Sequence, residues 1–216
     1  MRWLVLITGM VLVVAGLYLR WQAPEDDPLR LAPDTSTLRD TASGPVLGGI
    51  SPAGAQAWLG IPYAAPPIGG QRWRAPAPPR GWLAPRESLR FSDVCPQFAS
   101  RLSASSADVG TRIGSEDCLY LNVFAPRGVQ RGDALPVMVF IHGGGNTIGS
   151  ARPYDASRFV QEQGVVIVTL NYRLGVLGWF SHAALRETAA TTEDASGNFA
   201  LLDMVAALRW VRRNIA

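Results

Sequence analysis

The feature that most constrains the fold is a continuous apolar run, Pro136-Val-Met-Val-Phe-Ile141, that ends in His142-Gly-Gly-Gly145. An apolar run of this length, rich in β-branched residues, is typical of a strand that is buried on both faces of a sheet. Glycines directly after the strand let the backbone come close to a ligand, because no Cβ blocks the approach. The pattern therefore predicts a buried strand followed by a turn whose backbone N–H groups face a cleft.

The rest of the chain alternates between strand and helix patterns. Further strands are expected at 45–47, 57–61, 119–124 and 165–172. A short helix is expected at 155–163, begun by Asp155 and ended by Gly164, and a longer one at 197–216 has apolar residues at helical spacing (Leu201, Met204, Val205, Leu208, Val211 and Ile215). Buried strands that alternate with helices predict a doubly wound α/β sheet.

A glycine turn of this kind stabilises negative charge on a carbonyl oxygen in ester hydrolases, where it needs a nucleophile as its partner. No Gly-x-Ser-x-Gly occurs in the 216 residues. In the nearest match, Gly49–Gly54, the residue after Ser51 is a proline, which has no N–H to donate, so Ser51 is interpreted as a turn residue. His142 and His182 come too early in the chain for the base of such an enzyme and are interpreted as structural or surface side chains.

The N-terminus is apolar from Trp3 to Leu19, with Arg2 before this stretch and Arg20 after it. Such a helix would span roughly 26 Å, close to the hydrocarbon thickness of a bilayer. Residues 1–20 are therefore expected to be either a signal anchor or a cleaved signal peptide, and in both cases the remainder is exported. The polar, proline-punctuated segment 21–44 is expected to be a flexible linker, which leaves 45–216 as the folded part.

Composition excludes some classes of partner. All 20 basic residues are arginine, they are scattered, and the net charge is only +3, so no nucleic-acid-binding face is expected. Two cysteines and two distant histidines do not make a metal site, and no cofactor is expected. Cys95 and Cys118 would be independent thiols in a reducing compartment, whereas in an exported chain they are expected to form a disulfide.

Several blocks, taken together, resemble the N-terminal part of the type-B carboxylesterase family, which includes the cholinesterases. They are Leu59–Ala64 leading to Arg72-Trp73, Ser115-Glu-Asp-Cys-Leu-Tyr-Leu-Asn-Val123, Val137–Gly145, Asn171-Tyr-Arg-Leu-Gly175 with Gly178-Trp-Phe180, and Gly197-Asn198 through Leu202-Asp203 to Ile215. The resemblance covers about 45–216 and implies an α/β-hydrolase fold. One departure is Asn146, where a glycine or an aromatic residue is common in the family.

The resemblance also implies roles for particular residues. Gly144 and Gly145 match the glycines that donate to the oxyanion, Cys118 and Cys95 match the first disulfide, and Arg72 and Glu116 match a buried ion pair. In the family, the helix seen here at 198–216 leads toward the serine elbow. The sequence thus corresponds to a fold truncated before the nucleophile elbow, and with nucleophile, acid and base absent it is expected to be inactive alone.

Two readings of function remain at this point. The first is an exported ester hydrolase that would act on a small carboxylic ester once complete. The second is a non-catalytic cholinesterase-like binding or adhesion module, or a truncated gene product. Because adhesion members of the family often alter the oxyanion glycines, the intact Gly143–Gly145 favours an enzyme.

Overall fold

The structure, a computed structural model, describes residues 29–130 and 132–215. Its strands are β1 (Arg39–Thr41), β2 (Gly44–Leu47), β3 (Gly49–Ile50), β4 (Gln56–Pro62), β5 (Arg86–Glu87), β6 (Gln97–Phe98), β7 (Arg112–Ile113), β8 (Tyr120–Ala125), β9 (Val137–Ile141) and β10 (Val166–Leu170). Its α-helices are α2 (Ser157–Gln163), α3 (Gly175–Gly178), α4 (Ala183–Glu187) and α5 (Phe199–Asn214), and its 3₁₀ turns are η1 (Thr35–Thr37), η2 (Gly69–Gln71) and η3 (Arg101–Ser103). The main strands and helices lie where the sequence pattern predicts them.

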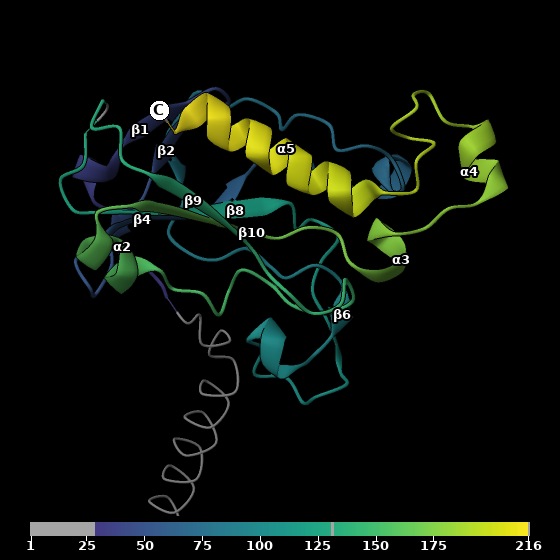
Figure 1. Cartoon of the computed structure of the whole chain (residues 1–216), viewed down its shortest axis with the longest axis horizontal. Helices are drawn as coiled ribbons and strands as arrows, with labels where there is room; N and C mark the ends of the chain where they lie inside the picture. Colours follow the sequence, from purple (N-terminus) through teal and green to yellow (C-terminus); the bar gives the residue numbers. More distant parts are fainter. Residues whose placement is uncertain (1–28, 131, 216) are drawn as a thin grey trace, which may run out of the picture.

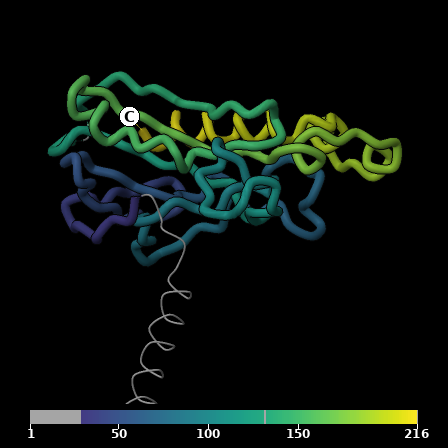
Figure 2. Tube along the Cα trace, turned by 90° about the horizontal axis from the view of Figure 1, so that it is seen from below, coloured from purple at the N-terminus to yellow at the C-terminus, as the bar shows by residue number. Residues whose placement is uncertain are grey.

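The central sheet of the described residues has the strand order β3-β4-β8-β10-β9. β10 pairs antiparallel with β8 but parallel with β9, with Val168 opposite Val139. A parallel pair needs a crossover connection, and α2 supplies it between β9 and β10. Small sheets of β1-β2-β5 and β6-β7 flank this core. Figure 2 shows the purple and blue N-terminal segments gathered on one side of the later green and yellow ones.

Helices cover both faces of the central sheet, as a doubly wound fold requires. α5 lies across one face and α2 packs on the opposite one (Figure 1). Successive side chains of a strand point to opposite faces, so Val123 joins the core cluster that contains Trp210 of α5, while Phe124 joins the cluster that contains Val160 of α2. Full burial of a side chain such as Phe124 contributes about 1.5–3 kcal/mol to stability.

The face of α5 that packs on the sheet matches only part of the apolar stripe in the sequence, because Met204, Val211 and Ile215 pack against the core but two leucines do not. Leu201 and Leu208 are 50% and 46% exposed, whereas the buried positions are Phe199, Ala200, Asp203, Ala207 and Trp210. A charged residue, Asp203, therefore lies in the centre of the buried face. Its partner from the loop after β10, described below, fixes which side of the helix faces inward.

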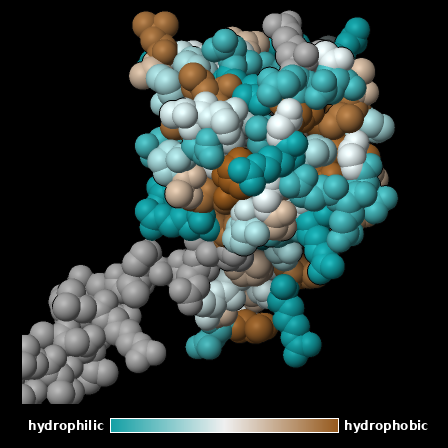
Figure 3. All heavy atoms as spheres, turned by 90° about the vertical axis from the view of Figure 1, so that its left-hand side faces the viewer, coloured by the Kyte–Doolittle hydropathy of each residue, from teal (hydrophilic) through white to brown (hydrophobic). Residues whose placement is uncertain are grey.

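β9 departs from the expectation of a strand buried on both faces. Val137, Met138, Phe140 and Ile141 are between 38% and 51% exposed, because β9 has a strand neighbour on one side only within the described sheet. Hydrophobic side chains also reach the surface elsewhere, and Figure 3 shows them in small patches among hydrophilic residues at one end of the molecule. An edge of this kind, apolar and unpaired, is a surface on which further chain can pack.

The prediction of a flexible linker over 21–44 is wrong for the part that the structure describes, 29–44. Leu29 and Leu31 are buried against the α2 side of the sheet, and β1 pairs with β2. The buried Thr37 receives a hydrogen bond from the Trp58 indole at its carbonyl, over 2.7 Å. Residues 1–20, including the predicted span 3–19, lie outside the described residues. None of the described helices has the length and apolar character needed to cross a bilayer.

Candidate active site: the glycine turn after β9

The glycine turn lies at the carboxyl end of β9, beside the end of its parallel neighbour β10. Gly144 has a φ of +120°, Gly145 of +61° and Asn146 of +61°, all in the region that favours glycine. The Gly144 carbonyl accepts hydrogen bonds from the N–H groups of Thr147 and Ile148, each over 3.2 Å. In open α/β sheets, ligands bind outside the carboxyl ends of the strands, which is where this turn lies.

Successive backbone donors of the turn, from Gly143 to Asn146, have no acceptor within the described chain. The N–H groups of Gly144 and Gly145 have no acceptor among the residues that the structure describes. A Cβ on Gly144 would overlap the Ile148 carbonyl oxygen, whereas a Cβ on Gly145 would meet nothing within 4 Å. Two adjacent unpaired N–H groups are able to stabilise an oxygen atom as it gains negative charge.

His142 anchors the start of the turn. Its ring is buried and stacks on Tyr172 with 4.4 Å between ring centroids, and Nδ1 lies 2.9 Å from the Gly143 carbonyl. That oxygen can only accept, so Nδ1 carries the proton. Burial lowers the pKa of the His142 imidazole, which favours the neutral form. The Tyr172 hydroxyl donates to the His142 carbonyl over 2.8 Å, which joins the turn to the end of β10.

A buried ion pair fixes the loop that follows β10. Arg173 and Asp203 of α5 are 3% and 0% exposed at their side chains, and two guanidinium N–H groups reach the carboxylate over 2.8 and 2.7 Å. The backbone N–H of Arg173 also donates to Asp203, over 3.1 Å. Burial raises the pKa of the Asp203 carboxyl, and the hydrogen bonds from Arg173 oppose that shift. A further N–H of Arg173 donates to the Arg74 carbonyl over 2.9 Å.

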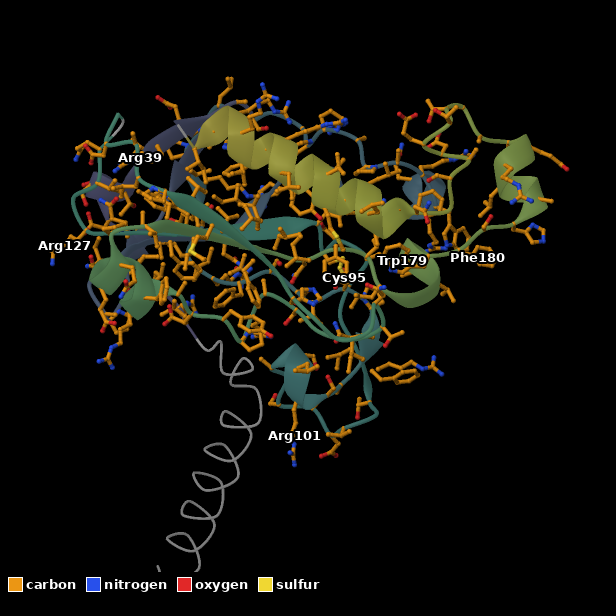
Figure 4. All side chains as sticks on the ribbon, in the orientation of Figure 1. Arg39, Cys95, Arg101, Arg127, Trp179 and Phe180 are labelled. Carbon is orange, nitrogen blue, oxygen red and sulfur yellow. A yellow bond between two sulfur atoms is a disulfide. The ribbon has the colours of Figure 1, made fainter. Side chains whose placement is uncertain are left out.

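The loop that follows β10 also contacts the glycine turn directly. The Gly175 N–H donates to the Asn146 carbonyl over 2.7 Å. Trp73 donates from its indole to the Val176 carbonyl over 2.8 Å and contacts Phe180, with 5.6 Å between ring centroids. Figure 4 shows Trp179 and Phe180 together between α3 and α4. The turn and the loop after β10 therefore form one connected unit.

A disulfide joins Cys95 and Cys118, which are both buried. The loop that it closes contains Gln97, whose side chain exchanges two hydrogen bonds with the backbone of Gly149, over 2.8 and 2.9 Å. A Cβ on Gly149 would meet His142 Nδ1 at 2.7 Å, so the chain after the glycine turn passes close to the His142 ring. The disulfide loop thus stabilises the segment that directly follows the glycine turn, through the Gln97 hydrogen bonds.

The structure also brings Arg72 and Glu116 together. Two hydrogen bonds of 2.6 Å join the guanidinium to the carboxylate, but the side chains are 39% and 26% exposed. The pair is therefore half-buried, in contrast to the buried pair expected from the sequence. Arg72 directly follows the exposed η2 turn on the surface, which explains its access to water.

The two remaining candidates have structural positions. The Ser51 hydroxyl accepts a hydrogen bond from the Ala55 N–H over 3.1 Å within a tight turn, in agreement with its interpretation as a turn residue. His182 is exposed and caps α4 by accepting from the Ala184 N–H over 3.2 Å. Neither side chain lies in the glycine turn.

Sequence reasoning missed the contacts that position the turn. Arg173 and Asp203 were both inside recognised blocks, and an aspartate within an amphipathic helix is a signal for a buried partner. The Asn146–Gly175 hydrogen bond and the Gln97 contacts with Gly149 join segments that are far apart in the sequence, and no local sequence pattern predicts them.

Comparison with known proteins agrees with this geometry. The model of the carboxylesterase family matches residues 35–216. The chain is 46% identical over 183 residues to fumonisin B1 esterase of Sphingopyxis macrogoltabida, covering 84% of this chain and 32% of that protein. It is 42% identical over 170 residues to para-nitrobenzyl esterase of Bacillus subtilis, covering 78% of this chain and 33% of that protein.

Solved structures lead to the same conclusion. A structure of PNB esterase superposes with a TM-score of 0.70 at 41% identity, over 82% of this chain and 35% of the other. The chain thus spans about a third of the length of the relatives that it matches. On the family match and these identities, the protein belongs to the carboxylesterase family and has the fold of an α/β-hydrolase fragment.

Proposed function

We propose that this chain supplies the oxyanion-binding part of a carboxylic ester hydrolase. The observation that carries the proposal is the pair of unpaired N–H groups, on Gly144 and Gly145, at the carboxyl ends of β9 and β10. These donors polarise the ester carbonyl and stabilise the tetrahedral oxyanion once a nucleophile attacks. The serine, acid and base come from polypeptide that corresponds to the other two thirds of the relatives, so the 216 residues alone are inactive.

We further propose that the protein acts outside the cytoplasm, held at the membrane by residues 3–19 or released after cleavage of 1–20. The apolar stretch at 3–19 and the Cys95–Cys118 disulfide support this location, because disulfides persist in oxidising compartments. A reporter enzyme that is active only after export, fused after Gly44, tests it. We expect an active fusion, and an inactive fusion beside an active cytoplasmic reporter would contradict it.

A chimera tests the proposed function. In it, residues 35–216 replace the matching third of the Bacillus subtilis para-nitrobenzyl esterase. We expect the chimera to hydrolyse p-nitrophenyl acetate and the 216-residue chain to show no turnover above background. A folded chimera without turnover would refute the proposal, as would labelling of the 216-residue chain by a serine-directed organophosphonate.

Two matched alanine variants of the chimera separate the oxyanion role from general packing. Gly144→Ala places a Cβ against the Ile148 carbonyl at a φ that alanine rarely adopts, so the turn must shift. Loss of one oxyanion donor typically lowers kcat about 100- to 1000-fold, and we expect a loss of this size. Gly143→Ala meets nothing within 4 Å and is the control, with little change expected. Equal activity of the two variants would contradict the assignment.

A further inference from the structure

A groove of about 560 Å³ lies on the surface between α5 and the proline-rich segment that follows η2, and no residue of the glycine turn lines it. Pro76 and Pro78 line it on one side, α5 contributes Arg209, Arg212 and Arg213, and Tyr63 also belongs to the lining. Both walls belong to the described chain, and neither includes the edge strand β9. Its volume is within the range of pockets that bind small molecules.

The arginines of the groove have no ion-pair partner among the residues that the structure describes. Within residues 29–130 and 132–215, none of the three forms an ion pair with a carboxylate. Within the described part of the chain, Arg213 donates only from Nε, to the Arg209 carbonyl over 3.2 Å, and the outer N–H groups of its guanidinium have no partner there. Hydrogen bonds, and to a smaller extent the charge of Arg209, lower the pKa of the Glu193 carboxyl, but no ion pair joins these two described residues.

The opposite wall is held in place by backbone contacts. The Ala77 carbonyl accepts from the Ala65 N–H over 2.8 Å, and the Ala75 N–H donates to Asp194 over 2.7 Å. The Tyr63 hydroxyl is occupied as well, because it donates to the Asn171 carbonyl over 2.7 Å. Among the side chains that line the groove, the guanidinium groups of the arginines are therefore the polar groups that remain available to a ligand.

We infer that this groove binds a small anion that carries two or more carboxylate or phosphate groups. Residues three and four apart on a helix have Cβ atoms about 5–6 Å from each other, so Arg209 can act together with Arg212 and Arg213 on one ligand. Guanidinium groups bind carboxylate and phosphate oxygens in a bidentate manner. A ligand with a single charge would use only one of these cations and would bind more weakly.

Binding to the full 216-residue chain, kept in a non-ionic detergent, tests the inference without any need for ester turnover. Isothermal titration calorimetry would use citrate, pyrophosphate and acetate as probes, at about 0.1 M and about 1 M salt. We expect citrate or pyrophosphate to bind at the lower salt concentration at least tenfold more tightly than acetate. Citrate and pyrophosphate distinguish a carboxylate ligand from a phosphate ligand.

Arginine variants locate the binding. Arg209→Gln and Arg213→Gln should each weaken binding about tenfold, since a hydrogen bond to a charged group contributes roughly that factor. Arg101→Gln is the control, because Arg101 lies in the disulfide loop and points away from the body of the molecule (Figure 4). Failure of both multivalent anions to bind, or binding that all three variants retain, would overturn the inference.

Discussion

Two arginine–carboxylate pairs of similar geometry but different burial allow a test of how much each ion pair contributes to the free energy of unfolding. Asp203→Asn removes the charge from the buried pair with Arg173, whose side chains are 3% and 0% exposed. Glu116→Gln makes the same change in the pair with Arg72, whose side chains are 39% and 26% exposed. Both pairs are bidentate and differ in burial, and Asp203 accepts one further hydrogen bond, from the Arg173 backbone N–H.

The expected magnitudes differ several-fold. Removing one partner of a buried pair leaves an uncompensated charge and costs about 3–5 kcal/mol, whereas an exposed pair contributes about 0–1 kcal/mol. In the Asp203→Asn variant, one side-chain oxygen remains at position 203 in place of the two that accept from Arg173, whose other carbonyl contacts are at Arg74, over 2.9 Å, and at Phe199, over 3.5 Å. We therefore expect about 3 kcal/mol or more for Asp203→Asn, and about 1 kcal/mol or less for Glu116→Gln.

Urea unfolding of the chimera, followed by tryptophan fluorescence, measures both values. The double variant Arg173→Met/Asp203→Leu adds a second check, because replacing both charges by apolar groups removes the unpaired charge. It should be more stable than Asp203→Asn alone, although the backbone N–H of Arg173 then loses its acceptor. A cost below about 1 kcal/mol for Asp203→Asn would refute the reasoning, since it would mean that water reaches the Arg173 guanidinium.

Three further predictions concern other parts of the chain. Replacing Cys95 and Cys118 by serine should lower the free energy of unfolding of the chimera by about 3 kcal/mol, and thiol titration of the unreduced, denatured parent should find no free thiol at either position. Burial lowers the pKa of His142 below its unfolded value, so its contribution to stability is present above pH 6.5 and is lost as the pH falls through the folded pKa. The difference in free energy of unfolding between the parent and His142→Gln should therefore shrink on acidification, and a constant difference would contradict this. The isolated chain should bind a hydrophobic dye through the β9 edge, and Phe140→Lys should reduce the fluorescence while Leu83→Lys, at an exposed site elsewhere, should not.

The sequence by itself determined the family, the main strands and helices, and the candidate oxyanion turn. These are local signals: an apolar run marks β9, and three successive glycines permit the positive φ values at Gly144 and Gly145. The pairing of Cys95 with Cys118 followed from the expected export and from family resemblance, that of Arg72 with Glu116 from the resemblance alone, and the structure brings both pairs together. The exposure of the second pair could not be predicted, because it depends on the surface position of η2.

Only the tertiary structure decided what holds the turn in place. Three contacts connect segments between about 30 and 50 residues apart: the Arg173–Asp203 ion pair, the Asn146–Gly175 hydrogen bond and the hydrogen bonds between Gln97 and Gly149. No periodicity within one segment predicts such contacts. The tertiary structure also decided the burial of Leu29 and Leu31, which the sequence analysis assigned to a polar linker and which pack against the α2 side of the sheet. Local patterns report which backbone conformation a segment prefers, whereas burial depends on the neighbours that the whole fold brings to each residue.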